Sequence, residues 1–190
     1  DIFNSRIPGS GDKGFLRTGD LGFLDGKGEL FICGRITDVI IIDGANYYPQ
    51  DIEHSAIKSH KALSPDAGAA IPWQVNGKEQ LVLVQEVRRT ERHRLDPAAI
   101  FAAVAKAISE NHGISLHRLI LVRPGTIPKT SSGKIQRRRC IAELEQGSLE
   151  ALAEWSRFSA KNIAVAPAVL SIPSLKAWIT GRVAEVLGIR

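Results

Sequence analysis

The alternation of apolar and polar residues predicts short strands and tight turns over residues 1–36. Two apolar-rich segments, Leu21–Leu24 and Glu29–Cys33, flank the turn-forming run Asp25-Gly26-Lys27-Gly28, which favours a hairpin. A β-branched run at Val39–Ile42 then predicts a further strand. The chain therefore opens with β-structure.

Two amphipathic helices follow. The first is predicted to begin at Pro49, because proline suits the first helical position, and to end near His60. In the second, Asp96 is a suitable cap before Pro97, apolar residues recur on one face, and Gly113 ends the helix.

Three more strands are expected, at Ala67–Trp73, Gln80–Val87 and Leu116–Val122. The first two join through Asn76-Gly77, a favoured hairpin turn. After a loop, a basic helix is predicted over Ile135–Glu145. The order βαββαβα predicts a compact α+β domain, with a small sheet flanked by helices.

The periodicity also suggests boundaries. Residues 1–36 form a β-rich segment, 37–147 the α+β domain, and 148–172 a linker that is rich in alanine, valine and proline towards its end. Within 173–190, Ser174–Gly188 has the apolar spacing of one more helix.

The composition indicates which class of protein and which cellular compartment to expect. The sequence contains no methionine, so we expect it to be a piece of a longer polypeptide. No apolar run approaches the ~20 residues that span a bilayer, and no signal segment opens the chain. The two cysteines, Cys33 and Cys140, lie far apart, which favours a reducing, cytoplasmic compartment over a disulfide framework.

The net charge of +5 is unevenly distributed. Residues 111–142 contain no acidic residue and seven basic ones, namely Arg118, Arg123, Lys129, Lys134, Arg137, Arg138 and Arg139. Such a block favours a polyanionic partner, although a solvated helix face would have the same composition. Nucleic acid fits poorly, because no recognised binding motif is present and aromatic residues do not interleave with the charges. The five histidines show no metal-ligand spacing, so no metal site is predicted.

Three motifs occur in a fixed order. They are Arg17-Thr18-Gly19-Asp20, the run from Gly34-Arg35 to Asp43-Gly44, and Pro128-Lys129-Thr130-Ser131-Ser132-Gly133-Lys134. In this order and spacing they closely resemble the late motifs of the adenylate-forming superfamily, which includes acyl-CoA synthetases, non-ribosomal-peptide adenylation domains and luciferases. The resemblance covers roughly residues 12–147. It implies the end of a large amino-terminal core followed by a small lid domain.

The resemblance assigns nucleotide contacts to four residues. A carboxylate on a turn, as at Asp20, can accept hydrogen bonds from both ribose hydroxyls, and the family uses it in that way. The arginine after a strand-end glycine, Arg35, can fork onto ribose or phosphate oxygens. Thr18 and Gly133 belong to the same nucleotide-binding motifs.

The resemblance also implies a hinge at Thr37 and Asp38, between core and lid. The pivot lies two positions after the arginine, at Thr37, where relatives usually have Asp or Lys. A hinge needs only a few residues that tolerate large changes in φ and ψ.

Lys134 is the predicted catalytic residue. Adenylation brings a carboxylate against the α-phosphate of ATP, and a cation between these two anions offsets their repulsion and stabilises the transition state. Lysine suits this role because it is a compact charge on a flexible stem. The polar loop before it can approach phosphate closely.

The run Tyr48-Pro49-Gln50-Asp51-Ile52-Glu53, with Ile135–Arg139 and Ala153-Glu154-Trp155, resembles the fatty-acyl-AMP ligases. That resemblance implies activation of a fatty acid with Mg²⁺-ATP, bound mainly by the amino-terminal core, and transfer to the phosphopantetheine of an acyl carrier protein. Carrier docking would fall to Arg137, Arg138 and Arg139. The lid of an acyl-CoA synthetase or an amino-acid adenylation domain, and a non-catalytic docking module, remain alternatives. The helix at Ser174–Gly188 resembles the first helix of a carrier domain, and a closing helix of the lid is the alternative.

Overall fold

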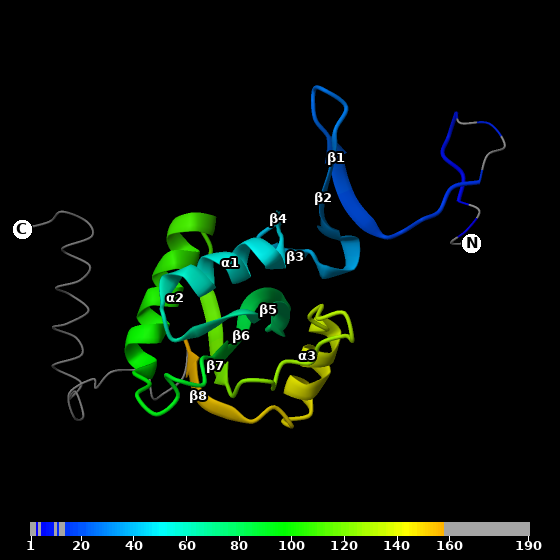
Figure 1. Cartoon of the computed structure of the whole chain (residues 1–190). Helices are drawn as coiled ribbons and strands as arrows, with labels where there is room; N and C mark the ends of the chain where they lie inside the picture. The colour runs from blue at the N-terminus through cyan, green and yellow to red at the C-terminus, as the bar shows by residue number, and fades with distance from the viewer. Residues whose placement is uncertain (1–2, 4, 10, 12–13, 158–190) are drawn as a thin grey trace, which may run out of the picture. The chain divides into compact units, whose positions relative to one another are not determined.

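The computed structural model describes residues 3, 5–9, 11 and 14–157. Figure 1 shows the elements in chain order. They are β1 (Asp20–Leu24), β2 (Leu30–Arg35), the 3-10 helix η1 (Ile36–Asp38), β3 (Ile40–Ile42), β4 (Ala45–Tyr47), α1 (Pro49–Ser59), β5 (Leu63–Val75), β6 (Lys78–Val87), α2 (Pro97–His112), β7 (Leu116–Val122), α3 (Arg137–Glu145) and β8 (Ala151–Ser156).

The central sheet has four strands in the order β5-β6-β7-β8. β5 and β6 form an antiparallel hairpin whose turn residues, Asn76 and Gly77, both have positive φ (51° and 76°). β6 and β7 are parallel, and α2 provides the crossover that parallel neighbours require. β7 and β8 are antiparallel.

Helices cover both faces of this sheet (Figure 1). On one face, α1, α2 and β3 pack through a core that includes Ile52, Val104 and Leu83. On the other, α3 contributes Cys140 to a second core with Val82. Because both faces are buried, β6 is a continuous buried run from Leu81 to Val87 and does not alternate with polar residues. The predicted α+β fold is confirmed.

The predicted hairpin at the start of the chain is present as β1 and β2, which pair antiparallel. The Asp25 carboxylate closes the turn by accepting from the amides of Lys27 (2.8 Å) and Glu29 (2.9 Å). Phe23 and Phe31 stack on its surface with ring centroids 5.3 Å apart.

Two strands were not predicted. β4 has only three residues and exists because it pairs with β3. β8 lies within the predicted linker 148–172, so the prediction of a linker is wrong at 151–156. Pairing with β7 satisfies the backbone groups on one side of this edge strand, and Trp155 packs on Phe101 with centroids 6.2 Å apart. The predicted helix at Ser174–Gly188 falls outside the described residues.

The last helix begins two residues later than predicted, at Arg137. Ile135 instead forms an antiparallel bridge with Lys129, and the Gln136 amide donates to the Pro128 carbonyl (2.9 Å). These bonds close the base of a loop over residues 128–136.

Candidate functional site

Lys134 lies on this closed loop before α3. The Thr130 amide donates to the Lys134 carbonyl (2.8 Å), and the Lys134 amide donates to Thr130 Oγ1 (3.0 Å). Gly133 has a φ of +82°, in the left-handed region, and its amide donates to the Thr130 carbonyl (2.9 Å). Thr130 therefore fixes the backbone from which the exposed Lys134 side chain projects.

Asp20 and Arg35 are brought together by the β1–β2 register. They are directly opposite each other, and Arg35 Nε lies 3.3 Å from Asp20 Oδ1. The Asp20 amide donates to Thr18 Oγ1 (3.1 Å). Thr18, which is also predicted to contact the nucleotide, therefore lies beside Asp20. The Arg35 side chain is 65% exposed and the Asp20 side chain 36%, so a ligand can reach both. Among the described residues, no interaction joins this pair to Lys134.

The predicted hinge residues lie in η1. Thr37 is exposed, and its hydroxyl donates to Asp38 Oδ1 (3.1 Å). The other carboxylate oxygen of Asp38 lies 3.5 Å from Arg137 Nη1. This contact links a predicted hinge residue to the first residue of α3.

Arg137 is also held by Glu53, in a bidentate pair. Its Nε donates to Glu53 Oε1 (2.9 Å) and its Nη2 to Glu53 Oε2 (2.7 Å). The Ala70 amide donates to Glu53 Oε1 as well (2.9 Å). The Arg137 side chain is 14% exposed and that of Glu53 only 9%, so this guanidinium has little surface left for a partner.

Burial raises the pKa of the Glu53 carboxyl, while the bonds and charge of Arg137 reduce that rise. For Arg137, burial acts to lower the pKa, but the hydrogen bonds and charges of Glu53 and Asp38 together outweigh burial, and the pKa is raised. Two charge-assisted hydrogen bonds favour the ionised form of both groups at neutral pH. Burial also raises the pKa of the nearby Cys140 thiol to about 12, which leaves it an unreactive core residue.

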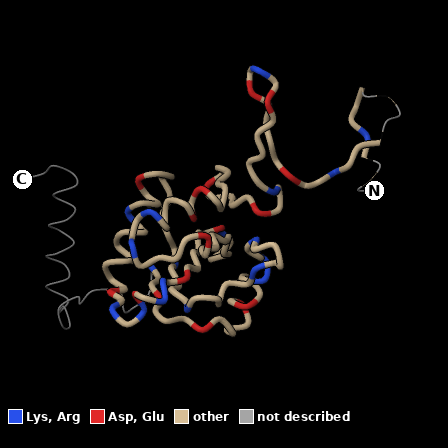
Figure 2. Tube along the Cα trace, viewed as in Figure 1, with Lys and Arg blue, Asp and Glu red and all other residues tan. Residues whose placement is uncertain are grey.

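The three arginines that were predicted to dock the carrier protein differ in their exposure to solvent. Arg138 and Arg139 are exposed, and Arg139 Nε donates to Glu143 one helical turn away (2.9 Å). Figure 2 shows the Lys and Arg positions around the start of α3. Any docking surface on this helix would therefore use Arg138 and Arg139.

Glu53 is the site residue that the sequence analysis missed. The sequence analysis named it only as the last residue of the run that begins at Tyr48, and gave it no role. A signal was available, because Glu53 lies beside Ile52 and one turn before Ala56 and Ile57, on the apolar side of the helix. A carboxylate in that position needs a buried partner.

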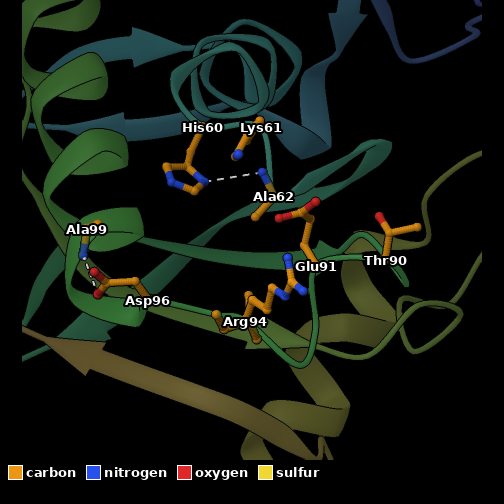
Figure 3. Close-up of a pocket in the computed structure, with 9 residues that line it drawn as sticks. His60, Lys61, Ala62, Thr90, Glu91, Arg94, Asp96 and Ala99 are labelled. Atoms are coloured by element: carbon orange, nitrogen blue, oxygen red, sulfur yellow. Dashed lines mark hydrogen bonds between the residues drawn. The ribbon is translucent and has the colours of Figure 1, made fainter.

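A surface pocket lies apart from these residues, between the end of α1 and the start of α2. Figure 3 shows the His60 ring there, whose Nδ1 accepts a hydrogen bond from the Ala62 amide (3.2 Å). Asp96 caps α2 through the Ala99 amide (3.1 Å). Side chains of both signs line the pocket, including Lys61, Glu91 and Arg94, so it favours no ligand of one charge.

In the described part of the chain, no three His, Cys, Asp or Glu side chains gather in a way that could hold a metal ion. None of the helices within the same residues combines the length and apolarity needed to cross a membrane.

Comparison with known proteins places this architecture in a family. The model of the Disco-interacting protein 2-like AMP domain matches residues 37–154. The chain belongs to this AMP-domain family. The resemblance to adenylate-forming enzymes that the motifs indicated is thereby confirmed.

The relatives of this AMP domain include fatty-acid ligases. The chain is 46% identical over 148 residues to the medium-chain-fatty-acid–[acyl-carrier-protein] ligase JamA of Moorena producens (strain JHB), covering 78% of this chain and 25% of JamA. It is 40% identical over 176 residues to the long-chain-fatty-acid–AMP ligase FadD32 of Mycobacterium marinum, covering 78% of this chain and 28% of FadD32. The chain thus spans about a quarter of the length of these relatives.

Among solved structures, the fatty acid AMP ligase of Legionella pneumophila aligns with a TM-score of 0.51 and 38% identity, over 82% of this chain and 27% of that protein. The match supports the fold of the AMP domain independently of its motifs.

Proposed function

We propose that this AMP domain is the carboxyl-terminal part of a fatty-acyl-AMP ligase. The enzyme would join a fatty acid to ATP, giving acyl-adenylate and pyrophosphate, and then pass the acyl group to the phosphopantetheine thiol of a carrier protein. The observation that carries the proposal is an exposed Lys134 on a loop closed by Thr130, in a chain 46% identical to a fatty-acid ligase.

Lys134 would act where charge develops. Its ammonium reduces the repulsion between the attacking carboxylate and the α-phosphate, and it stabilises negative charge on the phosphate oxygens in the transition state. Asp20 would accept hydrogen bonds from the ribose hydroxyls, and Arg35, now paired with Asp20, would contact ribose or phosphate. Mg²⁺-ATP would be held mainly by the amino-terminal core, so we expect this chain alone to be inactive.

The proposal is tested on the full-length enzyme by pyrophosphate exchange with fatty acids of graded length. Lys134→Ala should lower exchange by at least ~100-fold, the scale of a single electrostatic group in a transition state. Transfer of the acyl group from preformed acyl-AMP should continue, because in that step the thiol attacks the acyl carbonyl carbon and no carboxylate has to approach the α-phosphate. Lys129→Ala is the matched control, since Lys129 is an exposed lysine at the base of the same loop.

Near-normal exchange in Lys134→Ala would overturn the assignment of Lys134. Exchange with amino acids instead of fatty acids would favour an amino-acid adenylation domain, a class represented among the solved structures by McyG with phenylalanyl-adenylate. Release of acyl-CoA in the presence of coenzyme A would favour an acyl-CoA synthetase.

Carrier docking would use the exposed arginines of α3. Reversing the charge of Arg138 and Arg139 should weaken transfer to an acidic carrier protein while leaving exchange unchanged, because docking and adenylation use different surfaces.

A further inference from the structure

Two buried carboxylates hold the Lys134 loop, one at each end. Before the loop, Glu86 Oε1 accepts a hydrogen bond from the Ile127 amide (2.9 Å). After it, Glu53 holds Arg137 through two hydrogen bonds of 2.9 and 2.7 Å. Both carboxylates are buried. The loop is therefore a short bridge between two fixed points.

The second fixed point lies only three residues from Lys134. The Gln136 amide donates to the Pro128 carbonyl, so any shift of the first turn of α3 also moves the base of the loop. The Glu53–Arg137 pair has a planar, forked geometry that lysine cannot reproduce. Arg137 thus anchors the start of α3, next to the residue whose amide closes the base of the loop.

The third contact of Arg137 differs from the other two. Its Nη1 lies 3.5 Å from Asp38 Oδ2, in a single longer contact, and Asp38 is 25% exposed. Asp38 directly follows Thr37, the predicted pivot. The contact between Arg137 and Asp38 can therefore break while the two hydrogen bonds of the Glu53–Arg137 pair stay intact.

From this geometry we propose that Arg137 is a positioning residue, which fixes the Lys134 loop through Glu53 and couples it to the hinge through Asp38. The inference rests on the proposed function. It assigns to Arg137 an internal role in adenylation, whereas docking on this helix is left to Arg138 and Arg139.

The test compares Arg137→Lys with wild type in the full-length enzyme. Pyrophosphate exchange should lose ~10- to 100-fold in kcat, because a small misplacement of a catalytic group can cost that much. KM for the fatty acid should stay constant, and transfer from preformed acyl-AMP should be retained. A merely structural defect would lower both half-reactions together.

Arg118→Lys is the matched control. Arg118 also forms a bidentate pair, with Glu154 (2.8 and 2.9 Å), but on the strand pair β7–β8 and away from the loop. It should leave both half-reactions unchanged. If Arg137→Lys behaves like Arg118→Lys, the proposal is overturned.

The coupling to Asp38 is tested by a double-mutant cycle. Asp38→Asn should change the rate of pyrophosphate exchange in the wild-type background. In the Arg137→Lys background it should have little further effect on that rate, because the two residues act through one contact. Additive effects would overturn the coupling.

Hydrogen exchange gives a readout that needs no activity. In Arg137→Lys the amides of Thr130, Gly133 and Lys134 should lose protection, while those of β6 keep it. Unchanged protection of the loop would refute the anchoring. If the wild-type enzyme fails to form acyl-adenylate, the proposed function fails, but the exchange data still decide whether Arg137 holds the loop.

Discussion

Glu53 and Arg137 depend on each other because neither charge is well solvated. Removing one partner of such a pair leaves an uncompensated buried charge, whereas neutralising both leaves a polar pair that can still form hydrogen bonds. The sign of the pH effect follows from the pKa of Glu53, which burial raises and Arg137 restrains.

Without Arg137, the pKa of the Glu53 carboxyl should rise further in the folded state. A raised pKa means that the folded state holds the proton more tightly than the unfolded state does. The stability of Arg137→Gln relative to wild type should therefore be highest below the unfolded pKa of ~4.3, and it should fall as the pH rises through the folded pKa.

We expect Arg137→Gln to lose ~3–5 kcal/mol of unfolding free energy at pH 7 and clearly less near pH 4, measured by urea unfolding at both values. The double variant Arg137→Gln/Glu53→Gln should lose less, with little dependence on pH. Arg139→Gln, which breaks only an exposed pair with Glu143, should change stability by no more than ~0.5 kcal/mol. A pH-independent loss in Arg137→Gln would contradict an ionised Glu53 in the folded state.

At the scale of elements, the sequence predicted the turns and helices that depend on residues close together in the chain. Asn76-Gly77 predicted the β5–β6 turn because both positions need positive φ, and the capped, periodic α2 was predicted nearly to the residue. β4 and β8 were missed because they are short and exist through pairing with β3 and β7.

The same distinction applies to the candidate site. The motifs predicted Lys134, and they also predicted Asp20 and Arg35, which the β1–β2 register brings face to face. The Glu53–Arg137 pair could not be predicted, because 84 residues separate its members and only the packing of α1 and α3 against the sheet brings them together.

β8 allows a direct test of side-chain packing at the edge of the sheet. Trp155 is half-buried against Phe101, so Trp155→Ala should remove apolar contact and lower the unfolding free energy by ~2 kcal/mol, less than for a fully buried tryptophan. Glu154→Gln, in the same strand, alters only the partly exposed pair with Arg118 and should cost ~1 kcal/mol or less. Urea unfolding ranks the two variants. Equal stabilities would mean that the strand contributes no packing.

At the scale of the whole molecule, the β1–β2 hairpin carries apolar side chains that the other described residues leave exposed. Phe23 is 56% exposed and Phe31 45%, and Leu24 and Leu30 beside them are also exposed. Contiguous exposed apolar residues of this kind mark an interaction surface, whereas single ones are common on any protein. In the proposed enzyme the occupant of this surface would be the amino-terminal core.

The chain on its own should therefore associate with itself through this hairpin. Replacing Phe23 and Phe31 by serine should shift the chain towards monomer, measured by sedimentation velocity at several protein concentrations, because the stacked rings are the largest apolar groups on the surface. Ile41→Ser is the matched control, since Ile41 is an exposed apolar residue of β3 outside the hairpin, and it should leave the distribution unchanged. In the full-length enzyme the same double replacement should instead destabilise the molecule, because there the rings would be buried. A chain that is monomeric at every concentration, with or without the two phenylalanines, would show that the hairpin is not an interaction surface.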